Sequence, residues 1–319
     1  MSNLQPYLKD ISPDRIQRNP DNPRLFFRPE EMDTLMASIR KYGIQVPIVV
    51  FEEKDDYILI DGERRWRCAL KLNIRRIPAL IQQKPSPLQN LLLMFNIHAL
   101  REQWDYLTIA NKLPDVVELF KQENDREPNE TELGEITGLT RGQIRRCRFL
   151  LDLPRKYKEL LHEELSLPKH TQKLSEDFFI EMERALKTVQ ARVPGAVQDP
   201  NTARDALIQK FRGGVIGNIT DFRKLSKIAT SIKNIGVKEA KARSAIADIL
   251  NPRTKTSITE VYAEQFEMRY DERKVSITID SIYEFLEEAA AGDPGVIVGD
   301  DLKAKLLKLK QLIDKVLRS

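Results

Sequence analysis

The chain has 319 residues, of which 41% are hydrophobic and 31% are charged, and its formal net charge is +4. This size predicts roughly two or three domains with real hydrophobic cores, and the apolar runs are too short for a membrane span. Because the net charge is small, any nucleic-acid binding has to rest on local clusters of arginine. Cys68 and Cys147 are the only cysteines, which indicates a reducing compartment without a structural disulfide.

The first 84 residues are predicted to form an α+β domain. Residues 1–30 are rich in proline and are predicted to be irregular. A helix is expected to begin near Pro29, because apolar residues recur there at helical spacing, and to end at Gly43. Further along, β-branched and apolar runs alternate with turns and with one more helical segment. The predicted strands are 46–51, 57–60 and 77–81, and the predicted helix is 62–72.

Residues 62–68 read Gly-Glu-Arg-Arg-Trp-Arg-Cys and directly follow a predicted strand. Arginines at a helix N-terminus are unfavourable for the helix alone, because that end already carries partial positive charge. They fit an anion that backbone N–H groups and guanidinium groups bind together. A solvated basic face on an ordinary surface helix explains the segment equally well, and the segment alone does not decide between the two.

Residues 85–192 are predicted to be helical, with breaks at Pro114, Pro128 and Pro154. Within them, residues 131–151 have the pattern of a helix-turn-helix. Gly138 is expected to form the turn, Leu139 to fill the space between the helices, and Thr140 to cap the second helix. Gly134 is small where the two helices must approach each other.

The second helix of this motif is predicted to present a basic face. Acidic partners are absent within residues 140–148, so that an ordinary ion-paired surface explains the pattern poorly. Arginine and glutamine can bond phosphates and base edges when such a helix lies in the major groove of double-stranded DNA. The predicted DNA-binding residues are Thr140, Arg141, Gln143, Arg145, Arg146 and Arg148.

Residues 193–256 are predicted to be a helical region with linkers, and residues 257–319 a C-terminal region of mixed α and β structure. Residues 275–280 alternate apolar and polar side chains, which predicts a half-buried strand. The last helix repeats Leu302, Leu306, Leu309, Ile313 and Val316 at heptad spacing. That stripe fits either packing within its own domain or a contact between two copies of the chain.

Taken together, four stretches in this order resemble the ParB-type partition family, over roughly residues 10–170. They are Asn-Pro-Asp-Asn-Pro-Arg at 19–24, Gly-Ile-Gln-Val-Pro-Ile at 43–48, Gly-Glu-Arg-Arg-Trp-Arg at 62–67, and the helix-turn-helix with its trailing Leu-Leu-Asp-Leu-Pro at 150–154. The resemblance implies a nucleotide-binding N-terminal domain before an all-α DNA-binding domain. The fold class is therefore expected to be α+β and mostly α.

By the same resemblance, the N-terminal domain binds CTP with Mg²⁺ and closes as a clamp around DNA. The implied nucleotide-binding residues are Arg24, Gly43, Gln45, Gly62, Glu63, Arg64, Arg65, Arg67 and Asn96. In the family, a Glu-Asn pair helps to hold Mg²⁺. Here Phe95 replaces the glutamate, and Asn96 remains as a weak Mg²⁺ ligand. The nearest arginine, Arg101, is displaced from the position that the motif gives it. Because Phe95 offers no oxygen to the metal, CTP hydrolysis is left open. Glu102 is the acid that could compensate.

The predicted function is therefore site-specific DNA binding in plasmid, chromosome or mobile-element partition, by a cytoplasmic, nucleoid-associated protein that forms a homodimer. A ParB-like transcription regulator without nucleotide turnover is one alternative. A nucleotide hydrolase or nuclease that uses an Arg64/Arg65 pocket is the other. The resemblance also implies a partition ATPase as partner, although Lys9 is the only basic residue of the first ten.

Overall fold

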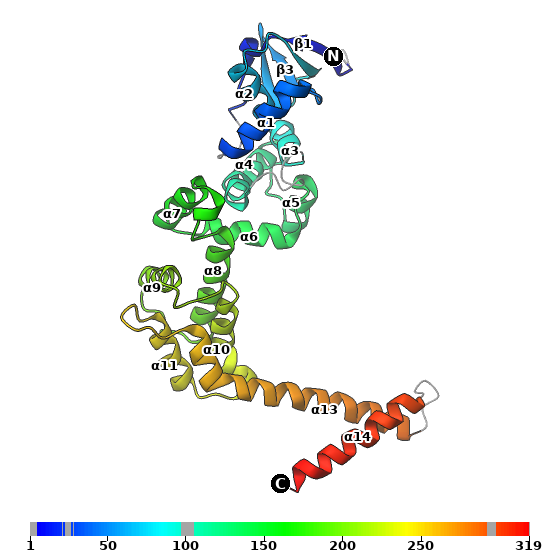
Figure 1. The fold of residues 1–319 in the computed structure, drawn as a ribbon, viewed down its shortest axis with the longest axis vertical. Helices are drawn as coiled ribbons and strands as arrows, with labels where there is room; N and C mark the ends of the chain where they lie inside the picture. The colour runs from blue at the N-terminus through cyan, green and yellow to red at the C-terminus, as the bar shows by residue number, and fades with distance from the viewer. Residues whose placement is uncertain are drawn as a thin grey trace. The chain divides into compact units, whose positions relative to one another are not determined.

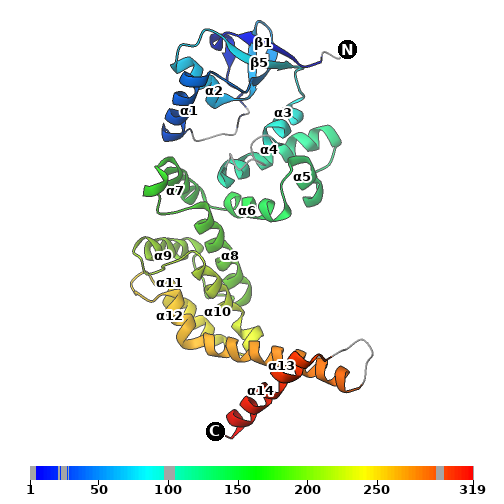
Figure 2. The same cartoon turned by 45° about the vertical axis from the view of Figure 1, so that its right-hand side comes forward.

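The computed structural model describes residues 5–20, 22, 27, 29–96, 105–291 and 298–318. They belong to two compact units, Met1–Ala185 and Leu186–Ser319, shown in Figures 1 and 2. The fold is α+β and mostly helical, as predicted, and in the described ranges no helix is long and apolar enough to cross a membrane. The finer predicted division, after residues 84, 192 and 256, stays a prediction.

The first unit begins with a five-stranded mixed sheet in the order β1-β5-β3-β4-β2. β3 pairs antiparallel with β4 and parallel with β5, β1 is antiparallel to β5, and β2 is parallel to β4. The strands are β1 (Tyr7–Ile11), β2 (Ile16–Gln17), β3 (Ile48–Glu53), β4 (Asp56–Asp61) and β5 (Ile77–Gln82). β3, β4 and β5 confirm the three predicted strands.

Alternate residues of the central strands face opposite sides of this sheet, as the period of two requires. On one side Ile48, Val50 and Leu59 pack with Ala69 and Trp66 of α2 (Glu63–Lys71). α1 (Pro29–Tyr42) joins α2 through a cluster that contains Met32, Ile39 and Cys68. On the other side Phe51, Ile58 and Ile60 pack with Leu93 of α3 (Pro87–Met94). The sheet thus lies between the α1–α2 pair and α3.

The strands β1 and β2, with the short 3-10 helix η1 (Pro13–Arg15), correct the prediction that residues 1–30 are irregular. Four of the five residues of β1 are exposed, so only Ile11 carries a burial signal. An edge strand of this kind gains its order from hydrogen bonds to β5, which a hydrophobic pattern does not report.

The rest of the first unit is helical. It contains α4 (Tyr106–Asn124), α5 (Glu130–Thr137), α6 (Arg141–Leu151), α7 (Arg155–Ser166), η3 (Lys169–Thr171) and the start of α8 (Glu176–Arg192). The predicted break at Pro114 is wrong, because α4 runs through it. Leu113 and Val116 are buried beside that proline, and packing of this face outweighs the hydrogen bond that proline removes.

The second unit contains the end of α8 and α9 (Pro200–Arg212), α10 (Asp221–Ile235), α11 (Glu239–Leu250), α12 (Ile258–Tyr262), the π-helical turn η4 (Ala263–Glu267), α13 (Met268–Ala290) and α14 (Asp300–Leu317). The predicted strand over residues 275–280 is wrong, since α13 is helical there. Val275, Ile279 and Ile282 also fit helical spacing, and so short an alternation cannot separate the two periods.

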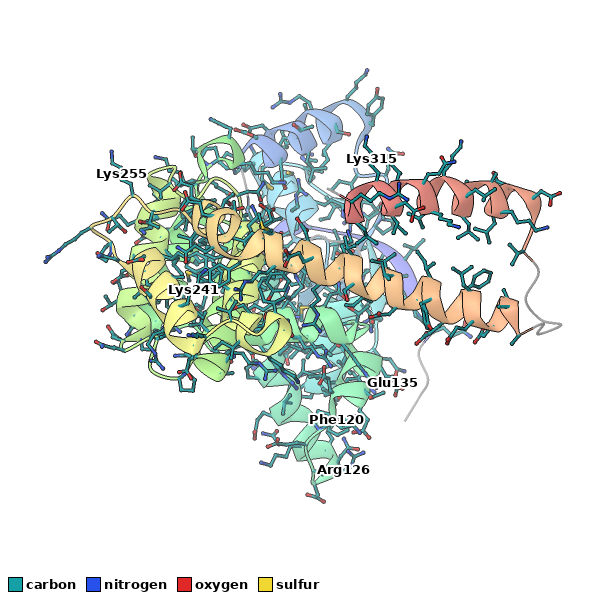
Figure 3. The ribbon with its side chains drawn as sticks, turned by 90° about the horizontal axis from the view of Figure 1, so that it is seen from below. Phe120, Arg126, Glu135, Lys241, Lys255 and Lys315 are labelled. Carbon is teal, nitrogen blue, oxygen red and sulfur yellow. The ribbon has the colours of Figure 1, made fainter. Side chains whose placement is uncertain are left out.

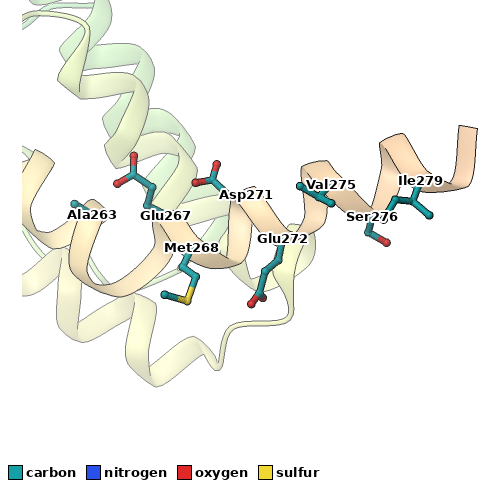
Figure 4. A pocket seen from close by; sticks show the side chains of 8 residues that line it. All are labelled: Ala263, Glu267, Met268, Asp271, Glu272, Val275, Ser276 and Ile279. Carbon is teal, nitrogen blue, oxygen red and sulfur yellow. The ribbon is translucent and has the colours of Figure 1, made fainter. Parts of the chain in front are cut away.

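The two C-terminal helices have no buried residue in the described chain. Figure 4 shows one side of α13, where Met268, Val275 and Ile279 stand among acidic side chains. A groove of about 720 Å³ lies between α13 and α14. Its lining includes an apolar stripe of α13, made of Val275, Ile279 and Ile282, and Leu309, Ile313 and Val316 of α14. Both helices therefore keep apolar faces that the described part of the chain does not cover.

Candidate nucleotide site and DNA interface

The predicted anion site lies at the start of α2, where β4 turns into the helix at Gly62. Gly62 has a φ of +98°, and a Cβ there would lie 2.6 Å from Cγ2 of Ile48. Only glycine fits this turn, because the conformation is left-handed and β3 is in direct contact. Gly62, the N-cap residue of α2, has no side chain that could accept from the first backbone N–H groups, and the N-terminus of a helix favours an anion.

The arginines of α2 do not form a bare cation cluster, because each has a partner within the protein. Arg64 donates to the backbone oxygen of Glu31 at 3.1 Å and lies 3.5 Å from its carboxylate. Arg65 pairs with Asp61 at 2.8 Å and donates to the backbone oxygen of Pro47 at 2.7 Å. The positive charge of these two side chains is therefore partly balanced by carboxylates of the protein itself.

Glu63 forms ion pairs with two further arginines. Its side chain is buried, and it pairs with Arg67 at 2.5 Å and with Arg18 at 3.4 Å. The guanidinium carbon of Arg67 also lies 4.2 Å from the ring centroid of Phe27. A groove of about 510 Å³ opens here. Its lining includes Trp66 and also two basic residues that the sequence analysis missed, Arg18 and Lys71.

Arg65 also connects the start of α2 to the segment before β3. Its guanidinium donates to the backbone oxygens of Val46 and Pro47. Gly43, with a φ of +71°, ends α1 as predicted and leads into this segment. The structure thus holds Val46 and Pro47, which follow Gly43 and Gln45, beside the first turn of α2. Arg24 lies outside the described residues.

The implied Mg²⁺ ligands do not fit a metal site. Phe95 is fully buried in the core and offers no oxygen, and Asn96 is exposed just after α3. Within the described ranges, no three acidic, histidine or cysteine side chains gather closely enough to hold a metal ion. His98, Arg101 and Glu102 lie outside those ranges.

The segment predicted to be a helix-turn-helix contains α5, a left-handed Gly138 at φ +72° and α6. Leu139 is buried between the helices, as expected. The Thr140 hydroxyl accepts from the backbone N–H of Gln143 at 3.2 Å, and the Gln143 side chain accepts from the N–H of Thr140 at 2.8 Å. Both side chains thus form a reciprocal helix cap, a local role beside their predicted contact with DNA.

Three of the predicted DNA-binding arginines are exposed. Arg141 donates to the Thr131 hydroxyl at 2.6 Å. Arg145 and Arg148 share a single carboxylate, that of Glu130, at 3.2 and 3.6 Å. Because one carboxylate faces two guanidinium groups, this side of α6 keeps a net positive charge.

The opposite side of α6 packs on the first turns of α4 and α8. Arg146 pairs there with Asp177, and burial raises the pKa of the neighbouring Cys147 thiol to about 12. Glu176 accepts from the backbone N–H of Leu107 at 2.6 Å. Its pKa is raised to about 7 by burial and by the nearby carboxylates of Asp105 and Asp177. These acids lie far from α6 along the chain, so no local pattern in the sequence indicates that they contact it.

Comparison with known proteins finds relatives that match the N-terminal half of the chain. Residues 3–95 match the family model of the ParB N-terminal domain. The chain is 35% identical over 154 residues to a probable chromosome-partitioning protein ParB of Campylobacter jejuni, a match that covers 47% of this chain and 52% of that protein. The chain thus spans about half the length of this curated relative.

Two solved structures of ParB from Caulobacter crescentus, both C-terminally truncated, are also similar. The one complexed to the centromeric parS site has 21% identity and a TM-score of 0.43, covering 69% of this chain and 98% of that one. The one complexed with CTP-gamma-S has 22% identity and a TM-score of 0.29, covering 57% and 99%. From the family model and the curated relative we conclude that residues 3–95 form a ParB N-terminal domain and that about half of the chain is similar to ParB proteins.

Proposed function

We propose that this protein binds a specific DNA site through α6 and serves in DNA partition, with its N-terminal domain as a CTP-gated clamp. The observation that supports DNA binding best is the exposed side of α6, where Arg145 and Arg148 share one carboxylate, that of Glu130, and Arg141 donates to the Thr131 hydroxyl. Guanidinium groups on the exposed side of a second helix in this motif suit phosphate and base-edge contacts in the major groove.

A gel-shift titration at fixed salt tests this proposal, with a duplex that the wild-type chain selects from a random-sequence pool. The double variant Arg145→Ala/Arg148→Ala should lose about 10²-fold or more in affinity, since each specific arginine contact contributes about 1–3 kcal/mol. The control Arg253→Ala/Lys255→Ala removes the same charge from the second unit, where Figure 3 labels Lys255. Equal losses for both variants would mean that only bulk charge matters.

CTP binding is supported by the glycine N-cap of α2 and by the segment that Arg65 holds beside it. When bound, the triphosphate would meet backbone N–H groups at Gly62–Arg65, and Arg64 and Arg65 would have to share their charge between it and Glu31 and Asp61. Calorimetric titration with the four ribonucleotides should give heat with CTP alone. Heat with none of them would favour the ParB-like transcription regulator without nucleotide turnover.

The hydrolase or nuclease alternative needs a metal-holding acid. Phe95 supplies none, so Glu102 would have to take this role. Phosphate release from CTP with Mg²⁺, compared between the wild type and Arg65→Ala, tests this alternative. Release by the wild type that Arg65→Ala abolishes would favour a hydrolase. Since the matched region is about half of the relative, the partition role and the ATPase partner stay proposals.

We also propose that the chain is a homodimer joined through α13 and α14. A helix with no buried residue gains little stability by itself in water, so these two helices need a partner surface. Their charges are complementary, since α13 carries six acidic and three basic side chains and α14 carries five lysines and three aspartates. A second copy therefore offers both the apolar stripe and the matching charge, with α14 of one copy on α13 of the other.

Sedimentation analysis of the full chain tests the dimer. Ile313→Asp places a charge in the groove between α13 and α14 and should give a monomer. Leu307→Asp is the matched control, because Leu307 is more exposed than Ile313 and lies outside the groove lining. A monomeric wild type, or equal behaviour of the two variants, would contradict this interface.

A further inference from the structure

The arginines of α6 fall into two groups by exposure. The side chains of Arg145 and Arg148 are 66% and 53% exposed and share Glu130. The side chain of Arg146 is 27% exposed. Its Nε is buried without a hydrogen-bond partner in the described part of the chain. Arg146 therefore has a different environment from Arg145 and Arg148, although the sequence pattern predicts the same DNA-binding role for all three.

Arg146 lies between two other helices. Its guanidinium carbon is 4.6 Å from the ring centroid of Tyr106, in the first turn of α4. The same group pairs with Asp177 in the first turn of α8. The next residue, Cys147, is buried, and its sulfur lies 3.9 Å from the backbone oxygen of Tyr106. A planar guanidinium that stacks on a ring and pairs with a carboxylate fixes the positions of both elements.

The charges near Arg146 also disfavour DNA at this point. Asp105 begins α4, and Glu176 and Asp177 begin α8. Glu176 interacts electrostatically with both of these aspartates and with Cys147, the residue next to Arg146. A phosphate brought to Arg146 would meet the carboxylate of Asp177 and would have to replace it. By contrast, Arg145 and Arg148 can turn from their shared Glu130 with less loss, because both are more exposed.

We propose that Arg146 is a positioning residue, which sets the orientation of α6 on α4 and α8, and that DNA contact is made by Arg141, Arg145 and Arg148. This inference rests on the proposed DNA-binding function of α6. It replaces the prediction from sequence that Arg146 touches DNA. Its effect on affinity passes through the geometry of α6, so its loss should displace the other arginines without removing a phosphate contact.

The variant Asp177→Asn separates the two roles by the sign of its effect. If Arg146 were a DNA ligand held back by Asp177, removal of that carboxylate would free it and tighten binding to the selected duplex. If Arg146 positions α6, the same change loosens the helix and weakens binding by about tenfold. Affinity is measured well below the unfolding temperature, so that a role in stability alone would leave it unchanged.

Arg146→Ala and the matched variant Arg145→Ala then test the phosphate contact itself. Each phosphate contact contributes about 0.9 to the slope of log affinity against log salt concentration. Arg146→Ala should weaken binding and keep the wild-type slope, whereas Arg145→Ala should lower the slope. Arg146→Lys keeps the charge but not the planar stack and should restore binding only in part. A lower slope for Arg146→Ala, or tighter binding by Asp177→Asn, would overturn the proposal.

The alkylation rate of Cys147 gives a second test of the proposal, and this test needs no DNA. Because its thiol is buried under this contact, Arg146→Ala and Asp177→Asn should raise its rate of alkylation, followed by peptide mass spectrometry to separate it from Cys68. Arg145→Ala should leave that rate unchanged. If Arg145→Ala/Arg148→Ala binds DNA as the wild type does, the proposed function fails. The alkylation rates still report whether Arg146 holds α6, and unchanged rates would contradict that role.

Discussion

Gly62 is held so close to Ile48 that a Cβ on the glycine would lie 2.6 Å from the Cγ2 atom of the isoleucine. The glycine also has a φ of +98°. Both facts limit the turn between β4 and α2 to glycine, whatever binds there. The Gly-Glu-Arg-Arg stretch therefore has a structural reason for its first residue that is independent of any nucleotide.

We expect Gly62→Ala to destabilise the N-terminal domain strongly. The left-handed conformation costs about 1–2 kcal/mol for a residue with a Cβ, and crowding against Ile48 adds about 1–3 kcal/mol. The free energy of unfolding by urea measures the sum. Gly43→Ala is the control, because Gly43 has a φ of +71° but open space for a Cβ up to 4.0 Å. It should lose the backbone contribution alone, and an equal loss in both variants would rule out the contact with Ile48.

Glu176 should make the stability of the first unit depend on pH near neutrality. Its pKa is raised to about 7 by burial and by Asp105 and Asp177. A carboxyl group with a raised pKa binds its proton more tightly in the folded state, so its contribution to stability is complete below the unfolded pKa and is lost as the pH rises towards 7. Glu176→Gln should remove this loss and gain at most about 3 kcal/mol relative to the wild type between pH 4.5 and 8.

Thermal unfolding at several pH values measures this effect. In the Glu176→Gln variant the side-chain amide oxygen would still accept from the N–H of Leu107, so the helix start keeps its partner. A wild type and variant whose stabilities stay parallel across this pH range would show that Glu176 does not titrate there.

The ion pair between Arg126 and Glu132 should persist at acidic pH. Their side chains form two hydrogen bonds, at 2.8 and 2.6 Å, across the turn between α4 and α5, and Figure 3 labels Arg126 next to Phe120. The guanidinium and the backbone N–H of Asn129 lower the pKa of Glu132 to about 2. A lowered pKa contributes stability above the unfolded pKa, which is lost as the pH falls towards 2.

A carboxyl-resolved NMR titration checks the pKa of Glu132. Arg126→Ala should bring it back towards the ordinary value for glutamate, while the N–H of Asn129 keeps part of the shift. No change in this variant would mean that the helix cap alone holds the pKa low.

The sequence predicts those parts of the fold whose signal is local. β3, β4 and α2 follow from periodicity and a glycine turn, and α5–α6 from the spacing around Gly138. The strand proposed at 275–280 failed because so short a segment cannot distinguish alternation from a helical stripe. β1 was missed because its order comes from its partner strand.

The partners of the arginines could not be predicted for a similar reason. Within α6 no acid lies at helical spacing, yet Arg145 meets Glu130, 15 residues away, and Arg146 meets Asp177, 31 residues away. Arg64 meets Glu31, 33 residues away. Charge balance at a surface depends on tertiary contacts, so a local run of arginines shows where positive charge is concentrated but not which side chains remain available.

Substitution of Gly134 by alanine should destabilise the protein, although helix propensity alone favours alanine over glycine. A Cβ at Gly134 would lie 2.9 Å from the backbone oxygen of Leu139, which cannot move without displacing the turn at Gly138. Gly142, in the first turn of α6, has ordinary space, with its nearest neighbour the Thr140 hydroxyl at 3.8 Å. In a helix interior, alanine is favoured over glycine by about 1 kcal/mol. Gly142→Ala should therefore be neutral or stabilising. Gly134→Ala should instead lower the free energy of unfolding by about 1–3 kcal/mol through crowding. It should also weaken DNA binding, because α6 shifts on α5.

Urea unfolding measures the effect on stability, and the gel-shift titration measures the effect on DNA binding. A stabilised Gly134→Ala would show that the helices of the motif do not approach each other as closely as the structure has them.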